Sequence, residues 1–174
     1  MSSPLLSPDD VTEALSELVE ELVRLGAQTS IYIVGGAAVM IQAGREVLSR
    51  DIDALFAVSP ALTQAISVVA SNRNWPLDWL NNAVNMFASH FDTEKDWLPY
   101  IEKSGISLKV ASCELLLAMK LHAGRGRDAE DINLLIKACE ITTRREVEVI
   151  FDRFYQTESL KSRSQRLLAT YFED

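Results

Sequence analysis

The 174-residue sequence has few cysteines, few histidines and no hydrophobic run long enough to cross a bilayer. The two cysteines, Cys113 and Cys139, lie in apparently helical surroundings, so we expect reduced core thiols rather than a disulfide or a metal site. The two histidines, His90 and His122, give little basis for a two-histidine catalytic scheme, and we interpret both as structural.

Excess positive charge is also missing. The formal net charge is −8 at pH 7, which argues against broad nonspecific nucleic-acid binding, because such binding neutralises phosphates with basic side chains. A local basic patch remains compatible with this composition. The N-terminal residues lack a basic and apolar signal region, so we expect a cytoplasmic protein without a membrane segment.

The composition present is that of a globular protein, with 48% hydrophobic and 24% charged residues. We expect a single domain over residues 1–174, with a core at about 1–140 and a helical C-terminal part at about 142–174. Strand and helix patterns alternate along the chain, which predicts an α+β fold with a mixed sheet and packed helices. Helices are predicted at 7–25, 59–72, 112–123 and 128–138, and strands at 31–34, 51–56, 97–100 and 106–111.

The most informative stretch is residues 31–56. A short β-branched and aromatic run predicts a buried strand, and Gly35-Gly36 follows it, where the missing side chains permit a tight turn and a close approach to the backbone. Asp51 and Asp53 lie two residues apart on the next predicted strand, so they project to the same face. Paired carboxylates of this kind suit Mg²⁺ or Mn²⁺. A simple turn and a solvated strand end are the alternative interpretation.

A second informative stretch is residues 112–135. Lys120 lies within an apolar helical pattern, and a Gly-Arg-Gly-Arg break with Arg125 and Arg127 follows it. A lysine facing a carboxylate pair, with arginines on a turn, suits phosphate groups. Asp128 is interpreted as a helix cap and, alternatively, as a site residue; for Lys120 the alternative is an ordinary surface lysine.

Gly35-Gly36 followed by Asp51-Ile52-Asp53 resembles the signature of the DNA polymerase β-type nucleotidyltransferase superfamily. The likeness is strongest to its small bacterial members, which include abortive-infection and toxin–antitoxin toxins. The Gly-Arg-x-Arg-Asp pattern, preceded by Lys120 and followed by Asp131, extends it. Two departures are that Gly36 stands where serine is frequent and that the interval to Asp51 is slightly long.

The resemblance implies a role for each matching position. Asp51 and Asp53 would hold the metal, Lys120 would neutralise nucleotide phosphates, and Asp131 would lie near the active site, with Asp128 assigned less firmly. Gly35, Gly36, Ser49, Arg50, Arg125 and Arg127 are the expected nucleotide-binding residues.

The predicted strand at 106–111 carries no third metal-binding acid, which leaves Asp78, Asp128 and Asp131 as candidates for it. In the toxin-like relatives, a Trp-Leu-Asn element such as residues 79–81 lines the nucleotide cleft. The alternative here is a buried tryptophan with asparagine turn residues.

The expected function is metal-dependent transfer of a nucleotide from a nucleoside triphosphate to a tRNA end or a protein hydroxyl, with a toxin role and an antitoxin partner as further expectations. The alternative is a catalytically weak nucleotide-binding or interaction module of the same fold. A third option is RNA binding by the basic C-terminal helices, for which a solvated helical face is an equally good explanation. The basic residues concerned are Arg144, Arg145, Arg153, Lys161, Arg163 and Arg166.

Overall fold

A five-stranded mixed sheet forms the centre of the computed structural model, which describes residues 5–84 and 88–173. The strand order is β3-β2-β1-β5-β4. β1 runs antiparallel to β2 and parallel to β5, β2 runs parallel to β3, and β4 and β5 form an antiparallel hairpin. The predicted α+β class with a mixed sheet is therefore confirmed. The strands are β1 (Thr29–Ile33), β2 (Ile52–Phe56), β3 (Leu80–Asn81), β4 (Trp97–Lys103) and β5 (Ile106–Ala111).

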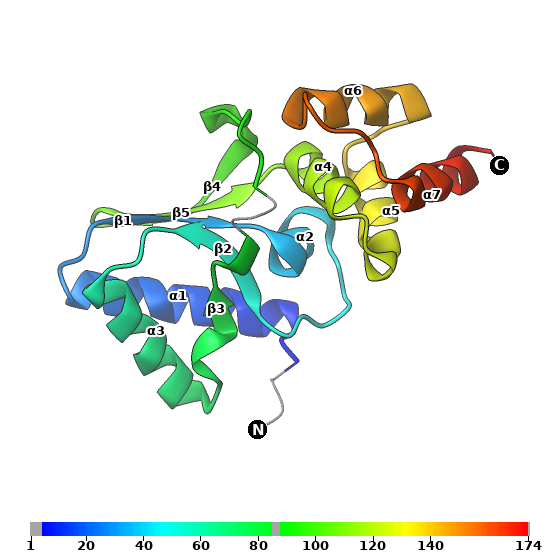
Figure 1. Ribbon diagram of the computed structural model, residues 1–174. Coiled ribbons are helices and arrows are strands. Elements are labelled where there is room, and N and C mark those ends of the chain that lie inside the picture. The colour runs from blue at the N-terminus through cyan, green and yellow to red at the C-terminus, as the bar shows by residue number, and fades with distance from the viewer. Residues whose placement is uncertain (1–4, 85–87, 174) are drawn as a thin grey trace.

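Helices occupy one face and one end of this sheet (Figure 1). α1 and α3 lie side by side along the face, and α2 lies with the C-terminal helices at the end of the sheet where β1 stops. The described part of the chain contains the helices α1 (Pro8–Arg24), α2 (Gly35–Ala43), α3 (Pro60–Arg73), α4 (Cys113–Ala123), α5 (Ala129–Ala138), α6 (Arg144–Phe154) and α7 (Ser162–Phe172).

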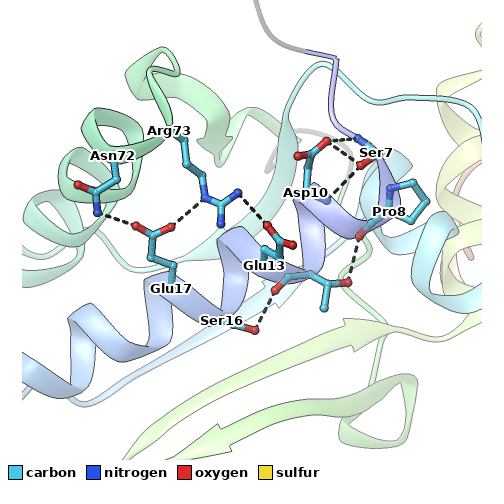
Figure 2. A network of polar contacts seen from close by, with 9 residues as sticks. Ser7, Pro8, Asp10, Glu13, Ser16, Glu17, Asn72 and Arg73 are labelled. Atoms are coloured by element: carbon cyan, nitrogen blue, oxygen red, sulfur yellow. Dashed lines mark hydrogen bonds and ion pairs between the residues drawn. The ribbon is translucent and has the colours of Figure 1, made fainter.

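Local sequence explains where α1 begins and how it is fastened to α3. The Ser7 side chain accepts a hydrogen bond from the Asp10 amide while the Asp10 carboxylate accepts from the Ser7 amide, which forms a capping box before Pro8 in the first turn. Glu17 then accepts hydrogen bonds from Asn72 at 2.6 Å and from Arg73 at 2.8 Å (Figure 2). These contacts join the polar sides of two helices whose apolar sides face the core.

β2 shows the alternation that its sequence predicts. Ile52 and Ala54 are fully buried in the core, while Asp53 between them points to the opposite face and is half-buried. Trp79 is also fully buried, and its indole N–H donates to the Ile66 carbonyl at 3.1 Å. This anchored tryptophan leads directly into the two-residue strand β3 and places Asn81 beside β2.

The C-terminal helices pack onto α4 and onto each other. α6 begins with the predicted capping box between Thr143 and Glu146, and it buries Phe151 and Phe154. Within residues 5–84 and 88–173, no helix is long and apolar enough to cross a membrane.

Candidate active site

The turn from β1 into α2 is shaped by side chains that fill the space beside its two glycines. Gly35 has φ +66°, and a Cβ built there would lie 2.5 Å from Oδ2 of Asp53. A Cβ at Gly36 would overlap Nη1 of Arg45 and would lie 3.1 Å from Oγ of Ser49. The positive φ and the Asp53 carboxylate together favour glycine at position 35, whereas at position 36 the guanidinium end of Arg45 would have to move to admit a Cβ.

The two predicted metal-binding aspartates lie together with an asparagine from β3. Asn81 is the register partner of Asp53 in the parallel β2–β3 pair. Its amide nitrogen donates to Oδ2 of Asp51 at 3.1 Å, and its amide oxygen accepts from the Ala83 amide at 3.1 Å. These two bonds fix the orientation of the Asn81 side chain, so its amino group faces the carboxylates.

Both aspartates are harder to ionise than an exposed carboxyl. Burial raises the pKa of Asp51 above its usual value, opposed by the hydrogen bond from Asn81. Burial and the neighbouring charge of Asp51 raise the pKa of Asp53, opposed by the positive charges of Lys120 and Arg125. Additional positive charge at this place would therefore stabilise the ionised pair.

A chain of alternating charges lies behind the aspartates. The Lys120 ammonium contacts Oδ1 of Asp128 at 2.7 Å and Oδ2 of Asp131 at 2.8 Å. The other oxygen of Asp131 lies 2.9 Å from Nε of Arg45. The side chains of Asp128 and Asp131 are each only 5% exposed, and that of Lys120 is 15% exposed, so this network is nearly buried. We call these four residues the buried network.

The aspartates and the buried network line one cavity of about 530 Å³. Arg50, Arg125 and Arg127 are exposed and lie around it, so their guanidinium groups face solvent near the carboxylates. The positive charges of Arg127 and Arg50 each lower the pKa of Asp51. The described lining of this cavity consists of Gly36, Arg45, Val47, Leu48, Ser49, Arg50, Asp51, Asp53, Lys120, Arg125, Arg127, Asp128 and Asp131.

Asp51 and Asp53 are suitable donors for a hard divalent cation, since both present carboxylate oxygens to this cavity. Within the described residues, no three Asp, Glu, His or Cys side chains lie close enough together to hold a metal ion. A Mg²⁺ ion at this pair would therefore need oxygen ligands from water or from a substrate, as is common for this ion.

Several sequence-based interpretations can now be compared with the geometry. Ser49 lies against Gly36 and donates to the Asp51 carbonyl at 2.9 Å. Asp128 occupies the N-cap position of α5, as predicted, but its side chain makes no capping hydrogen bond, and its carboxylate accepts from Lys120. The surface-lysine alternative for Lys120 is wrong, since the side chain lies within the buried network.

Sequence reasoning did not predict Arg45 as a site residue, and it indicated Asn81 only as part of the Trp-Leu-Asn element. Arg45 lies between two apolar segments in a loop, and nothing in its local pattern indicates that it contacts Gly36 and Asp131. Asn81 belongs to the Trp-Leu-Asn element, so the only signal for it was the resemblance. In the structure both interpretations of that element apply, because Trp79 is a buried core residue while Asn81 reaches Asp51.

Part of the basic C-terminal region is held in ion pairs. Arg144 and Arg145 contact Glu148, and Arg153 contacts Asp96 at 2.6 Å and Glu114 at 3.0 Å. These pairs favour the interpretation as a solvated helical face over an RNA-binding surface. Lys161, Arg163 and Arg166 are exposed.

A larger hollow, of about 690 Å³, lies toward the other end of the sheet. Tyr32, Trp97 and Lys109 line it together with Leu55. Leu55 is two residues from Asp53 on β2, so both side chains lie on one face of the sheet. The hollow lacks a carboxylate pair facing clustered arginines in its described lining, and we therefore place the candidate site at the smaller cavity.

A mixed sheet with a Gly-Gly turn beside Asp53 on β2, and Asp51 directly before that strand, is consistent with a nucleotidyltransferase-type fold. The comparison with family models agrees: residues 12–174 match the family described as "Nucleotidyltransferase of unknown function (DUF6036)", and the chain belongs to that family. No curated protein and no solved structure matches the chain significantly.

Proposed function

We propose that this protein is a metal-dependent nucleotidyltransferase that moves a nucleotide from a nucleoside triphosphate to a hydroxyl acceptor. The observation that carries the proposal is the convergence on one cavity of Asp51 and Asp53 with basic residues from three separate segments. Family membership supports the reaction class. A site that joins carboxylates for a metal to cations for phosphates has what nucleotide transfer requires.

The balance of charge suggests how the site would treat a triphosphate. Arg45 and Lys120 are matched by Asp128 and Asp131 within the buried network, so their charges are largely compensated. The exposed arginines at the rim therefore provide most of the attraction for phosphate oxygens, with bidentate geometry available to each guanidinium. They are Arg50, Arg125 and Arg127.

In nucleotide transfer, most of the rate enhancement is expected to come from positioning the acceptor hydroxyl and the triphosphate relative to each other. The acceptor oxygen bonds to the α-phosphorus, the bond to the departing pyrophosphate breaks, and the hydroxyl proton passes to a carboxylate of the site. Mg²⁺ or Mn²⁺ held by Asp51 and Asp53 would supply charge neutralisation when bound. Lys120 would stabilise developing charge, and Asp131 would hold Lys120 in place.

The acceptor that we propose is a tRNA end or a protein hydroxyl, and a toxin controlled by an antitoxin is the proposed biological setting. The hollow beside Leu55 lies on the same sheet face as Asp53, toward the other end of the sheet. The assignment of the acceptor rests on the resemblance.

The test is transfer of label from each α-labelled nucleoside triphosphate to total RNA and total protein with Mg²⁺. Asp53→Ala is assayed beside the wild-type chain, with Asp152→Ala as the matched loss of an exposed aspartate on α6, outside the described lining of the cavity. We expect labelled RNA or protein with the wild type and the control, and none with Asp53→Ala. Absence of label from every reaction with the wild type would overturn the proposal.

A second function is favoured by one observation. Among the described residues, no third carboxylate lies close enough to Asp51 and Asp53 to form a three-acid metal-binding group, which suits a nucleotide-binding or interaction module with weak catalysis. Nucleotide binding without label transfer, with Asp53→Ala binding as the wild type does, is the outcome expected of such a module.

A further inference from the structure

We propose that Asn81 sets the divalent-cation affinity of the Asp51–Asp53 pair, keeping it weak until triphosphate oxygens complete the site. This inference rests on the proposed function in assigning the ion to these two carboxylates. It adds a position-specific reason why the metal ion and the nucleotide would bind together. Asn81 thereby acts as a positioning residue on the neighbouring strand.

The β2–β3 register puts the Asn81 side chain where a third carboxylate would complete the cluster. Asn81 lies opposite Asp53 in the parallel pair and reaches Oδ2 of Asp51 at 3.1 Å. The side chain also contributes to a described hollow of about 420 Å³ beside both aspartates. A side chain at this position therefore faces the same space as the proposed metal ligands.

The Asn81 amide is oriented so that its amino group, and not its oxygen, faces the carboxylates. Its oxygen is used by the Ala83 amide, and its amino group, which has no lone pair for a metal, faces Asp51. Asn81 thus orients Asp51 through a hydrogen bond and adds no negative charge to the pair. The site keeps two acids and a neutral donor.

The other acids near the cavity do not make up the difference. Asp128 and Asp131 are bound to Lys120, and Asp131 is also in contact with Arg45. Asp78 lines the same hollow and its charge raises the pKa of Asp51, but it is exposed and forms no three-acid metal-binding group with the pair in the described chain. Mg²⁺ and Mn²⁺ favour about six oxygen ligands, so two carboxylates leave most positions to water or phosphate.

Asn81→Asp tests this with almost no change in shape. One oxygen can still accept from the Ala83 amide, while the other replaces the amino group that faces Asp51. Mn²⁺ binding to the full chain without nucleotide is measured from the free-ion electron paramagnetic resonance signal. Asn82→Asp is the matched control, because it adds the same charge one residue beyond β3 and outside the described lining of the hollow.

We expect Asn81→Asp to tighten Mn²⁺ binding by about tenfold or more, since adding a charged oxygen ligand moves such sites through whole decades of affinity. Asn82→Asp should stay within about twofold of the wild type, because a nearby charge alone adds little through water. The double variant Asn81→Asp/Asp53→Asn should lose most of the gain. The wild type should bind Mn²⁺ only weakly, at about 10⁻⁴ to 10⁻³ M, without nucleotide.

A folded Asn81→Asp variant with unchanged or weaker Mn²⁺ binding would overturn the inference. Should that variant not fold, the wild type decides: tight Mn²⁺ binding in the absence of nucleotide overturns it, and weak binding supports it. Label transfer reports separately on the proposed function. A gain of Mn²⁺ affinity in Asn81→Asp together with an inactive wild type would remove the transferase and leave the role of Asn81 standing.

Discussion

Two networks of charged side chains, the α1–α3 clamp and the buried network, differ in their exposure to solvent. The α1–α3 clamp joins Glu13 and Glu17 to Arg73, and the Glu13 side chain is 67% exposed. The buried network joins Arg45, Lys120 and two aspartates that are each 5% exposed. The same kinds of ion pair therefore operate in two different dielectric environments.

The difference indicates which network serves the site. An exposed pair contributes little to stability, since water and salt screen it. A nearly buried pair costs desolvation energy, and such a cost is retained where the groups have another use. The clamp is thus a surface contact between two packing helices, whereas the buried network holds Lys120 and Arg45 in position beside the aspartates.

The largest effect is expected from breaking the buried network at its centre. Lys120→Met would leave the carboxylates of Asp128 and Asp131 buried with much less positive charge beside them. Loss of one partner from a buried pair costs about 3–5 kcal/mol. Urea unfolding at pH 7 should show a decrease of that order in the free energy of unfolding.

The control for Lys120→Met is Lys103→Met. Lys103 pairs with Glu20 across the surface, and its side chain is 47% exposed. Its loss should cost no more than about 1 kcal/mol. Equal destabilisation by the two variants would show that burial does not distinguish the two networks.

A smaller loss is expected when the glycine turn is filled. Gly35→Ala would combine a positive φ, costing about 1–2 kcal/mol, with crowding of the Asp53 carboxylate. Gly44→Ala has nearly the same φ of +65° but meets no atom within 4 Å, so it carries the backbone cost alone. Thermal unfolding should place Gly35→Ala below Gly44→Ala, and equal melting temperatures would contradict the close approach of Asp53.

Features encoded over a few neighbouring residues could be predicted from the sequence. The caps at Ser7 and Thr143 and the alternation around Asp53 all rest on local hydrogen bonds and local periodicity, and the structure shows each of them. The Gly-Gly turn belongs to the same group, although its occupants, Asp53 and the guanidinium of Arg45, come from elsewhere in the chain.

The features that could not be predicted from the sequence depend on the packing of segments that are distant along the chain. β3 has only two residues and follows a proline, too little for a periodic signal, so the position of Asn81 opposite Asp53 was not predicted. Asp128 has a typical capping residue type at a helix start, yet the lysine eight positions earlier binds its carboxylate. The Asp128 carboxylate thus forms an ion pair with a nearly buried lysine rather than a hydrogen bond that caps the helix.

Removing charge from the aspartate pair should stabilise the protein in the absence of metal. The pKa of Asp53 is raised by folding, so the folded state holds its proton more tightly than the unfolded state does. Its contribution to stability therefore falls as pH rises from the unfolded to the folded pKa, and stays low above that window. Asp53→Asn should unfold at higher urea than the wild type at pH 7 without divalent ions.

That advantage should shrink as pH falls through the folded pKa toward the unfolded value of about 3.9 and be lost below it, where the wild-type carboxyl is protonated in both states. Asp152→Asn, at an exposed position on α6 outside the described lining of the cavity, is the control and should show little change at either pH. A variant Asp53→Asn that is less stable than the wild type at pH 7 would mean that the carboxylate is stabilised by its surroundings rather than strained by them.

The smallest effect is expected at the α1–α3 clamp. Arg73→Met removes the contacts to Glu17 at 2.8 Å and Glu13 at 3.5 Å but keeps most of the aliphatic stem that packs between the helices. The loss should be at most about 1 kcal/mol and should fade as salt is raised, because Glu13 is exposed and the Arg73 and Glu17 side chains are partly open to solvent. Urea unfolding in low and high salt measures this decrease in the free energy of unfolding. The decrease in Lys120→Met should persist in high salt, because the carboxylates that it leaves unpaired are shielded from ions. A salt-independent loss of several kcal/mol in Arg73→Met would instead place the clamp among the buried, strongly coupled contacts.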